Sequence, residues 1–322
     1  MTRIKNRLPV KPIDISIVVP VYNEESNIRP FLERLIDVMI KMGVDYEVIF
    51  AMDPSTDKTE DKITFEIERN KKVKLIKLSR RYGQPAATFA GIRNCTGEYC
   101  VVIDVDLQDP PELIENLYNK SLEGFEVVCA KRKSRRGEST VKKVISYLGY
   151  YIIDYLSDVE IPRNTGDFRI MSRKVINSLS ELNETHGFLR GLVGFVGFSQ
   201  SFIEYDRDDR YQGHGKYNRY FGSLRIGMNG IIGFSTRPLQ IMTIMGFLLS
   251  AFSFIIGGWY VFQKMVGLPL TPGLSTTILV VTFFAGIQLI SLGMMGEYIG
   301  RIYEEVKRRP MYIIDRKINF ED

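Results

Sequence analysis

Residues 101–111 read VVIDVDLQDPP, an apolar run that ends in acidic residues and two prolines. Its first part predicts a buried strand. Asp104 and Asp106 lie two residues apart, so their side chains point the same way on an extended backbone. Two such carboxylates repel each other unless a cation lies between them, and with the Gln108 amide they form an oxygen donor set that suits Mg²⁺ or Mn²⁺. On spacing alone, a strand that ends in a solvated acidic turn explains the stretch equally well, because D-x-D is a weak motif.

Apolar strand-like runs alternate with helical runs around this stretch. Strands are predicted at 13–21, 46–52, 73–78, 99–103 and 125–130, and helices at 24–42, 58–69, 84–94 and 111–122. This rhythm predicts a parallel, doubly wound α/β sheet. The turn after the first strand lacks G-x-G-x-x-G, and the chain contains no G-x-x-x-x-G-K-[ST], which argues against a dinucleotide site and a P-loop.

Acidic residues follow three of the predicted strands: Glu24 the first, Asp53 the second, and Asp104 with Asp106 the fourth. Each alone is most often a helix cap or a turn residue. Open α/β sheets bind ligands at the carboxyl ends of their strands, so these side chains are expected to converge on one edge. Together they describe a site for a cation and a hydroxyl-bearing ligand such as a nucleotide sugar.

Two long runs without a charged residue, 238–263 and 265–296, lie toward the C-terminus. A membrane-spanning helix needs about 20 apolar residues. The sequence therefore predicts two transmembrane helices, at about 238–262 and 274–296, separated by a turn that contains proline and glycine. Two buried helices of a soluble core are the weaker alternative, because two adjacent runs of this length are hard to bury.

The charge distribution is typical of a protein at a membrane surface. The N-terminal segment is basic but has no apolar signal-peptide core. Six Lys or Arg residues lie after residue 300, whereas the turn between the apolar runs carries only Lys264, so the positive-inside rule favours a cytoplasmic location for both ends. The net charge of +5 suits an anionic leaflet and is too diffuse to indicate nucleic acid.

The cysteines and histidines exclude some chemistry. The three cysteines form no C-x-x-C pair, and Cys100 and Cys129 are expected to be small core residues, which fits a reducing compartment. Only two histidines are present, His186 and His214, so a Ser-His-Asp mechanism is poorly provided for.

Five stretches together resemble the family 2 glycosyltransferases of the GT-A fold, and more narrowly the polyprenyl-phosphate glycosyltransferases. They are VVPVYNEESNI at 18–28, DPSTDKT at 53–59, SRRYGQPAATFAGI at 79–92, DVDLQDPPE at 104–112 and NTGDFRIMSR at 164–173. Each stretch alone is unspecific, but the combination is specific. The resemblance extends from about residue 13 to the C-terminal apolar runs, and it implies a mostly parallel GT-A sheet followed by a two-helix transmembrane hairpin.

The resemblance also implies an activity. It is the inverting, metal-dependent transfer of a hexose, with glucose from UDP-glucose favoured, to undecaprenyl phosphate or another polyprenyl phosphate. The same chemistry with GDP-mannose or a UDP-aminosugar as donor is the nearest alternative. A nucleotide-sugar-binding membrane protein without turnover is a further one.

The domain organisation that follows has four parts. They are a cytoplasmic catalytic domain at 1–217, an interfacial amphipathic helix at 218–236, the transmembrane hairpin at 237–300 and a basic cytoplasmic tail at 301–322. A second amphipathic helix is expected at 138–158. The implied location is the inner membrane of a bacterial-type cell, with the lipid bilayer as a partner, no nucleic acid, and a possible homo-oligomer.

On the donor side, the resemblance implies metal ligands and nucleotide-sugar contacts. The metal ligands are Asp104, Asp106 and Gln108, with Asp106 the strongest. The nucleotide-sugar contacts are Pro20, Tyr22, Glu24, Asp53, Arg80, Asp104, Arg210 and Lys216. Arg210 and Lys216 belong to a glycine-rich loop that is expected to close over the diphosphate. Met52 and Pro54 depart from the family's usual turn beside Asp53, which weakens the expected contacts of that turn with the base.

On the acceptor side, the basic run after the fifth predicted strand is implied to bind the lipid phosphate. The residues are Arg132, Arg135, Arg136 and Ser139. A phosphate monoester is largely a dianion at neutral pH, since its second pKa is about 6, so it needs cations to orient it more than it needs a base. Asp167 matches an acidic position near the anomeric carbon and is implied to act as a base or to orient the acceptor. Arg190 is expected to be structural.

Overall fold

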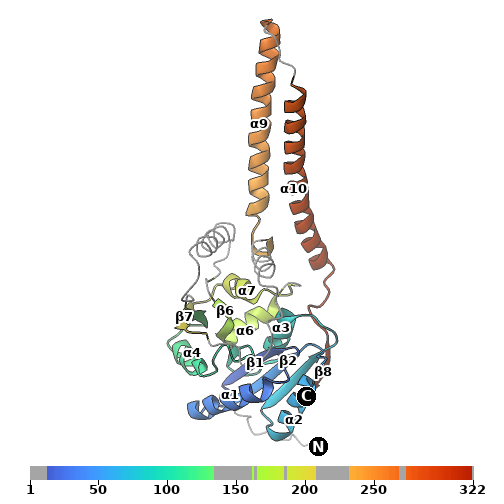
Figure 1. The fold of residues 1–322 in the computed structure, drawn as a ribbon. Coiled ribbons are helices and arrows are strands. Elements are labelled where there is room, and N and C mark those ends of the chain that lie inside the picture. The colour runs from blue at the N-terminus through green and yellow to red at the C-terminus, as the bar shows by residue number, and fades with distance from the viewer. Residues whose placement is uncertain are drawn as a thin grey trace, which may run out of the picture.

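The computed structural model describes residues 13–133, 162, 165–184, 187–207, 232–267 and 273–320. Within these residues one eight-stranded sheet has the order β7-β5-β6-β4-β1-β2-β3-β8 (Figure 1). Its strands are β1 (Ile15–Val21), β2 (Tyr46–Met52), β3 (Val73–Leu78), β4 (Tyr99–Val102), β5 (Val127–Arg132), β6 (Thr165–Ser172), β7 (Gln200–Tyr205) and β8 (Ile314–Ile318).

Strands β1 to β4 form the parallel half of the sheet, in which β1 pairs with β2 and β4, and β2 pairs with β3. The predicted α/β class and mostly parallel sheet are therefore confirmed. Strand β6, which the sequence analysis did not predict, lies antiparallel between β4 and β5. The stretch around Asp167 thus begins a central strand, and β5 pairs with β6 and β7 instead of continuing the parallel row.

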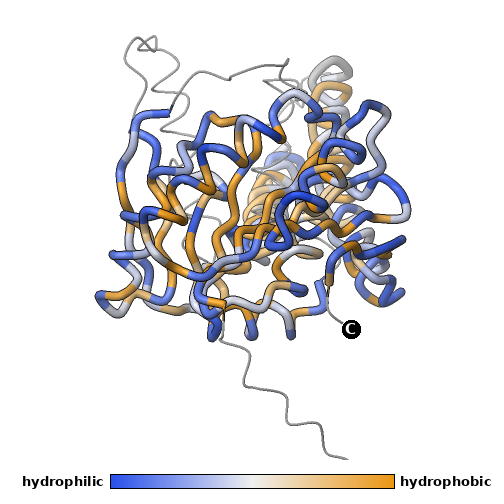
Figure 2. Tube along the Cα trace, turned by 90° about the horizontal axis from the view of Figure 1, so that it is seen from below, coloured by the Kyte–Doolittle hydropathy of each residue, from blue (hydrophilic) through white to orange (hydrophobic). Residues whose placement is uncertain are grey.

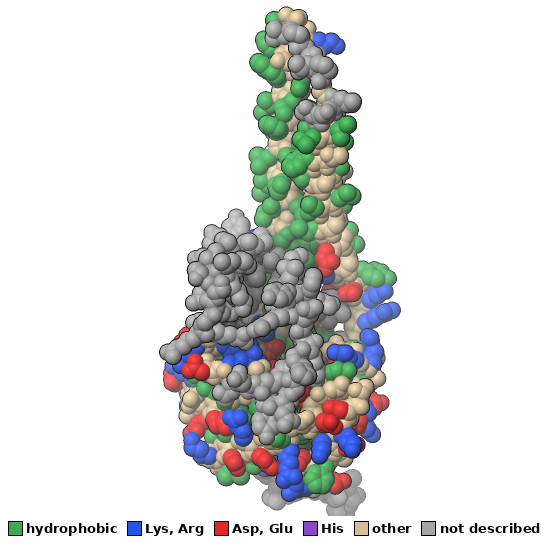
Figure 3. Space-filling view, viewed as in Figure 1, with side chains coloured by type: hydrophobic (Ala, Val, Ile, Leu, Met, Phe, Trp, Pro, Cys, Tyr) green, Lys and Arg blue, Asp and Glu red, His purple; other side chains and the backbone are tan. Residues whose placement is uncertain are grey.

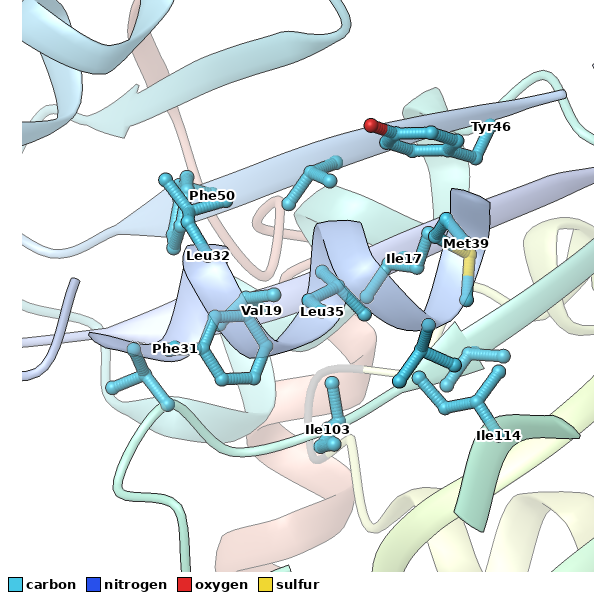
Figure 4. Close-up of a cluster of buried hydrophobic side chains, with 14 of the residues drawn as sticks. Ile17, Val19, Phe31, Leu32, Leu35, Met39, Tyr46, Phe50, Ile103 and Ile114 are labelled. Atoms are coloured by element: carbon cyan, nitrogen blue, oxygen red, sulfur yellow. The ribbon is translucent and has the colours of Figure 1, made fainter. Parts of the chain in front are cut away.

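Helices cover both faces of the sheet. Helices α1 (Ile28–Met42), α2 (Thr59–Arg69) and α4 (Leu113–Leu122) pack on one face, and α3 (Gln84–Asn94), α6 (Arg173–Glu181) and α7 (Leu189–Phe195) on the other. Strand β1 is buried throughout, and its side chains alternate between the two cores. In Figure 4, Phe31, Leu32 and Leu35 of α1 face Ile17 and Val19 of β1. Apolar segments accordingly lie inside and hydrophilic ones outside (Figure 2).

Helix α3 lies close to β1 because Gly91 has no side chain. A Cβ on Gly91 would collide with the Cγ1 atom of Val18 in β1. Val18 is in the parallel half of the sheet and Gly91 is in α3, so this close approach determines where the N-terminus of α3 lies relative to the carboxyl ends of the strands. Those strand ends carry the candidate site.

Two long helices project from the domain: α9 (Arg237–Met265) and α10 (Leu274–Val306). Each contains a segment that is apolar and long enough to cross a membrane, and none of that segment is buried within the protein. Figure 3 shows hydrophobic side chains along both helices and charged ones on the domain below. Helix α10 extends ten residues beyond the predicted end at 296, into the charged segment.

The chain returns to the sheet after the two long helices. Strand β8 pairs antiparallel with β3 and forms one edge of the sheet. The sequence predicts only a basic tail at 301–322, because a five-residue strand with exposed charges gives little periodicity. Because β8 pairs with β3, the chain that leaves the domain before α9 returns to its sheet after α10.

Candidate active site

The carboxyl ends of β2, β1 and β4 are neighbours, because these strands are adjacent and parallel. Glu24, Asp53, Asp104 and Asp106 follow these ends, so the structure brings the predicted acidic residues to one edge. Strands β1 and β4 pair only as far as Val18 and Val102, and Pro20 lies two residues further along β1. Proline has no N–H to donate, so at this position it removes no hydrogen bond to β4.

Asp104 and Asp106 are held by a tight turn after β4. Asp104 accepts a hydrogen bond from Nε2 of Gln84 at the start of α3, at 2.8 Å. Asp106 is 6% exposed and accepts a bond from the Gln108 backbone N–H at 3.2 Å. Leu107, the buried residue between Asp106 and Gln108, has a φ of 59°. A leucine in the left-handed region costs roughly 1–2 kcal/mol, so the surrounding packing must hold this turn in place.

The charge state of Asp104 reflects crowding by other carboxylates. Its pKa is raised to about 7, first by burial and then by the negative charges of Asp109, Asp167 and Asp106, while Arg132 opposes the shift. A cation between these groups would relieve the repulsion. In the described part of the chain no three His, Cys, Asp or Glu side chains form a metal-ligand set. Two carboxylates and one amide fit Mg²⁺ or Mn²⁺, since such ions take one or two protein carboxylates and complete their shell with phosphate and water.

Asp167 is surrounded by positive charges, whereas Asp104 is surrounded by carboxylates. Arg190 on α7 pairs with it, with Nε 2.9 Å from Oδ1. Burial raises the pKa of Asp167, but the positive charges of Arg190, Arg169 and Arg132 outweigh it, so the pKa is lower than usual. Arg190 was expected to be structural, and it directly contacts the predicted site residue. The 23-residue separation of the pair gives no local sequence signal.

Asp53 supports the N-terminal loop of α3. It is 2% exposed and accepts hydrogen bonds from the backbone N–H groups of Tyr82 at 3.0 Å and Gly83 at 2.8 Å. Gly83 has a φ of 96°, which suits glycine. The prediction that Asp53 contacts the base stays a prediction, and its structural role in this loop was not anticipated.

The aromatic and cationic groups beside this loop stack on one another. The guanidinium of Arg81 lies 4.2 Å from the ring centroid of Tyr22, and that of Arg80 lies 4.4 Å from the ring centroid of Tyr82. Glu24 accepts a hydrogen bond from Asn27 Nδ2 at 2.6 Å, and its own N–H donates to Thr59. The predicted nucleoside-side residues thus lie near one another at the β1 and β3 ends.

Arg132 ends β5 and points toward the acidic turn. It contacts Asp109 at 3.3 Å and donates from Nε to the Tyr205 hydroxyl at 3.2 Å. Its positive charge favours the ionised forms of both Asp104 and Asp167. The sequence predicts a site role for neither Asp109 nor Tyr205.

Several predicted site residues lie outside the described part of the chain. They are Arg135, Arg136, Ser139, Arg210 and Lys216, and the expected amphipathic helix at 138–158 and most of that at 218–236 lie outside as well. Their assignments stay predictions.

A mixed sheet of this topology, with acidic side chains at the ends of its parallel strands and helices on both faces, is the arrangement of the GT-A fold. The model of the glycosyl transferase family 2 matches residues 16–180. The chain belongs to this family.

Similar proteins extend the match over nearly the whole chain. An uncharacterized glycosyltransferase of Synechocystis is 40% identical over 302 residues, 94% of this chain and 95% of the relative. The SfII prophage-derived bactoprenol glucosyl transferase of Shigella flexneri is 36% identical over 94% of this chain and 97% of the relative. A solved glucosyl-3-phosphoglycerate synthase of Mycobacterium tuberculosis, in complex with Mn²⁺, UDP and phosphoglyceric acid, has a TM-score of 0.47 and 21% identity, covering 68% of this chain and 76% of that chain.

Proposed function

We propose that this glycosyltransferase transfers glucose from UDP-glucose to a polyprenyl phosphate at the membrane, in one displacement that inverts the anomeric centre. The observation that carries the proposal is the position of Arg132. It lies within electrostatic reach of both Asp104 and Asp167, in a chain that also has two membrane-length helices. An anion-binding group beside a nucleotide-sugar edge suits a phosphate acceptor, and a membrane hairpin suits a lipid one. The bactoprenol glucosyl transferase that covers 94% of this chain supports the same donor sugar and acceptor class.

On the donor side, we assign Asp104, Asp106 and Gln108 as the residues that would hold Mg²⁺ or Mn²⁺. Such an ion supplies neutralisation of the charge that develops on the leaving diphosphate. Gln84 orients the Asp104 carboxylate, and Asp53 fixes the loop that leads to Gln84. Tyr22, Glu24 and Arg80 are assigned to the nucleotide, with Arg210 and Lys216 as the closing loop.

On the acceptor side, the phosphate monoester is already an anion, so its oxygen can attack without prior removal of a proton. Asp167 is therefore assigned to orientation. Its lowered pKa makes it a weak base, and its pairing with Arg190 fixes its direction. Arg132 would hold the phosphate oxygens, with Arg135, Arg136 and Ser139 as predicted helpers.

The proposed setting is the cytoplasmic face of a bacterial inner membrane. We assign residues 1–217, together with β8, to the catalytic domain and α9 and α10 to the hairpin, and the interfacial helix at 218–236 stays a prediction. The five Lys and Arg residues after α10 support this orientation through the positive-inside rule.

The test is to incubate the purified full-length protein in detergent with polyprenyl phosphate and a panel of labelled UDP- and GDP-sugars, with Mg²⁺, Mn²⁺ or a chelator. We expect transfer from UDP-glucose that stops with the chelator. Asp106→Asn should lower kcat by at least 100-fold, while Asp61→Asn on the exposed side of α2 should leave it unchanged.

Other outcomes would change the proposal in defined ways. Transfer from GDP-mannose or a UDP-aminosugar alone would replace the donor. Tight binding of nucleotide sugars with no transfer from any of them would favour the non-catalytic alternative. Chelator-resistant transfer would remove the metal assignment.

A further inference from the structure

The buried carboxylate of Asp109 contacts side chains on or next to two other strands, β5 and β7. The side chain of Asp109 is 2% exposed and follows the acidic turn after β4. Arg132 of β5 approaches it at 3.3 Å, Arg207 just beyond β7 approaches through Nε at 3.4 Å, and the Tyr205 hydroxyl donates a hydrogen bond to it. We call these four residues the Asp109 cluster.

The Asp109 cluster carries more positive than negative charge. Arg132 and Arg207 both contact Oδ1 of the same carboxylate. Two guanidinium groups this close repel each other, and the carboxylate between them offsets that repulsion. Tyr205 contributes no charge, because burial and the neighbouring Asp109 raise its pKa well above the usual value. The cluster therefore keeps one net positive charge at the edge of the site.

Tyr205 fixes the direction of Arg132. The Arg132 Nε donates to its hydroxyl at 3.2 Å, and the tyrosine ring packs edge-on against buried Phe168, with centroids 6.3 Å apart. On another side, a Cβ added to Gly166 would lie 2.8 Å from Nη2 of Arg132. The guanidinium is therefore held between Asp109, Tyr205 and the backbone next to Asp167.

We propose that Asp109 and Tyr205 are positioning residues that hold Arg132 and Arg207 together as a two-arginine clamp for the phosphate group of the acceptor. Planar guanidinium groups bind phosphate oxygens through paired N–H donors. A phosphate monoester carries nearly two negative charges at pH 7, which two arginines match better than one. The clamp rests on the proposed function, because it names the groups that bind the proposed acceptor.

The test measures binding without turnover, on the full-length protein in detergent. The probes are a short-chain isoprenyl phosphate, the corresponding isoprenyl alcohol, and UDP with Mg²⁺. Arg207→Gln should weaken binding of the phosphate about tenfold or more, since a charge-assisted hydrogen bond is lost. Binding of the alcohol and of UDP should stay unchanged.

A matched control is available on the surface. Arg34 pairs with Glu112 through two hydrogen bonds, at 2.9 and 2.7 Å. Arg34→Gln removes the same group and the same charge outside the Asp109 cluster, so isoprenyl phosphate should bind with wild-type affinity.

The positioning role needs a readout that a purely structural role would not change. Tyr205→Phe keeps the ring and removes only the hydroxyl, and we expect it to raise the acceptor KM about three- to tenfold with the donor KM unchanged. Asp109→Asn should do the same more strongly, because two arginines then lose their shared carboxylate. Arg207→Lys, which keeps the charge but not the planar donor group, should recover only part of the affinity.

Three outcomes would overturn the clamp. If Tyr205→Phe and Asp109→Asn lower only the unfolding temperature, the cluster is structural. If Arg207→Gln weakens UDP as much as the isoprenyl phosphate, the clamp belongs to the donor, and if it weakens neither, Arg207 is not part of a clamp. A wild-type protein that binds isoprenyl phosphate but transfers no sugar would instead contradict the proposed function, and the binding differences would still report on the clamp.

Discussion

Asp104 and Asp167 lie at the same sheet edge, and their neighbours shift their pKa values in opposite directions. Asp104 is crowded by carboxylates, so its pKa is raised to about 7. Asp167 is surrounded by arginines, so its pKa is lowered despite burial. Such divergence separates the tasks of two acids in one site. Here it fits a cation beside Asp104 and a permanently charged orienting group at Asp167.

Replacing Arg190 tests whether the arginine charges keep Asp167 ionised. Arg190→Gln removes one of the positive charges that lower the pKa of Asp167, so this pKa should rise. The carboxylate signal of Asp167 in a ¹³C-labelled protein should therefore titrate at a higher pH than in the wild type, and Arg190→Lys, which keeps the charge, should shift it less. A signal that titrates at the wild-type pH in Arg190→Gln would mean that Arg190 does not lower this pKa.

The same pairing has a consequence for stability. A carboxyl whose pKa is lower in the folded protein stabilises the fold above its unfolded pKa, and this contribution is lost as the pH falls through the folded value. The wild type should therefore lose stability from Asp167 only in strongly acidic solution. Thermal unfolding of wild type and Arg190→Gln between pH 4 and 7 would reveal the difference.

Among the elements, helix α3 connects the core to the site. Its N-terminal Gln84 holds Asp104, and its Gly91 lies against Val18 in the middle of β1. The distance between helix and strand therefore decides whether the amide reaches the carboxylate.

Gly91→Ala should displace this helix. The added methyl group meets a buried valine in a filled core, and overpacking of this kind costs about 1–3 kcal/mol. We expect a lower unfolding temperature and a reduced kcat, because Gln84 moves with the helix. Gly246→Ala in α9 is the control, since no atom lies within 4 Å of an added Cβ there.

A second substitution makes the Gly91 prediction specific. Val18→Ala creates space for the new methyl group, so the double variant should recover part of the lost unfolding temperature. Equal unfolding temperatures for wild type and Gly91→Ala would show that the helix shifts without cost.

The elements also show what the sequence could predict. The parallel half and its acidic edge are readable because each strand, turn and helix is a local pattern. Strand β6 is not predictable from the sequence because NTGDFRIM alternates poorly and its neighbours on the sheet are distant in the chain. The roles of Arg190 and Tyr205 are hidden for the same reason, because Arg190 contacts Asp167 across 23 residues and Tyr205 contacts Asp109 across 96. The acids themselves were found because they directly follow strands.

At the scale of the whole molecule, the segment after α10 ties the helical hairpin to the loop at 79–83, beside the proposed nucleotide-binding residues. The Ser79 N–H donates to the carbonyl of Ile313 at 2.9 Å, just before the loop that Asp53 holds. Further along, Arg316 of β8 and Lys77 of β3 both pair with Glu60 of α2. A second attachment lies at the base of the hairpin, where Phe234, just before α9, packs against Phe188, just before α7, with ring centroids 6.2 Å apart. The hairpin therefore joins the catalytic domain at both of its ends.

Truncation after residue 310 tests this connection, because it removes β8 and keeps both apolar helices. Membrane insertion should be retained. The edge of β3 becomes exposed, which favours aggregation, and the loop at 79–83 loses its contact with Ile313. We expect UDP with Mg²⁺ to bind at least several-fold more weakly, and each kcal/mol lost should lower the unfolding temperature by roughly 2–4 °C. Truncation after residue 320 keeps β8 and should behave as the wild type in both measurements. Wild-type UDP affinity after the longer truncation would show that the donor side folds independently of the C-terminal strand, and the hairpin would then serve as an anchor alone.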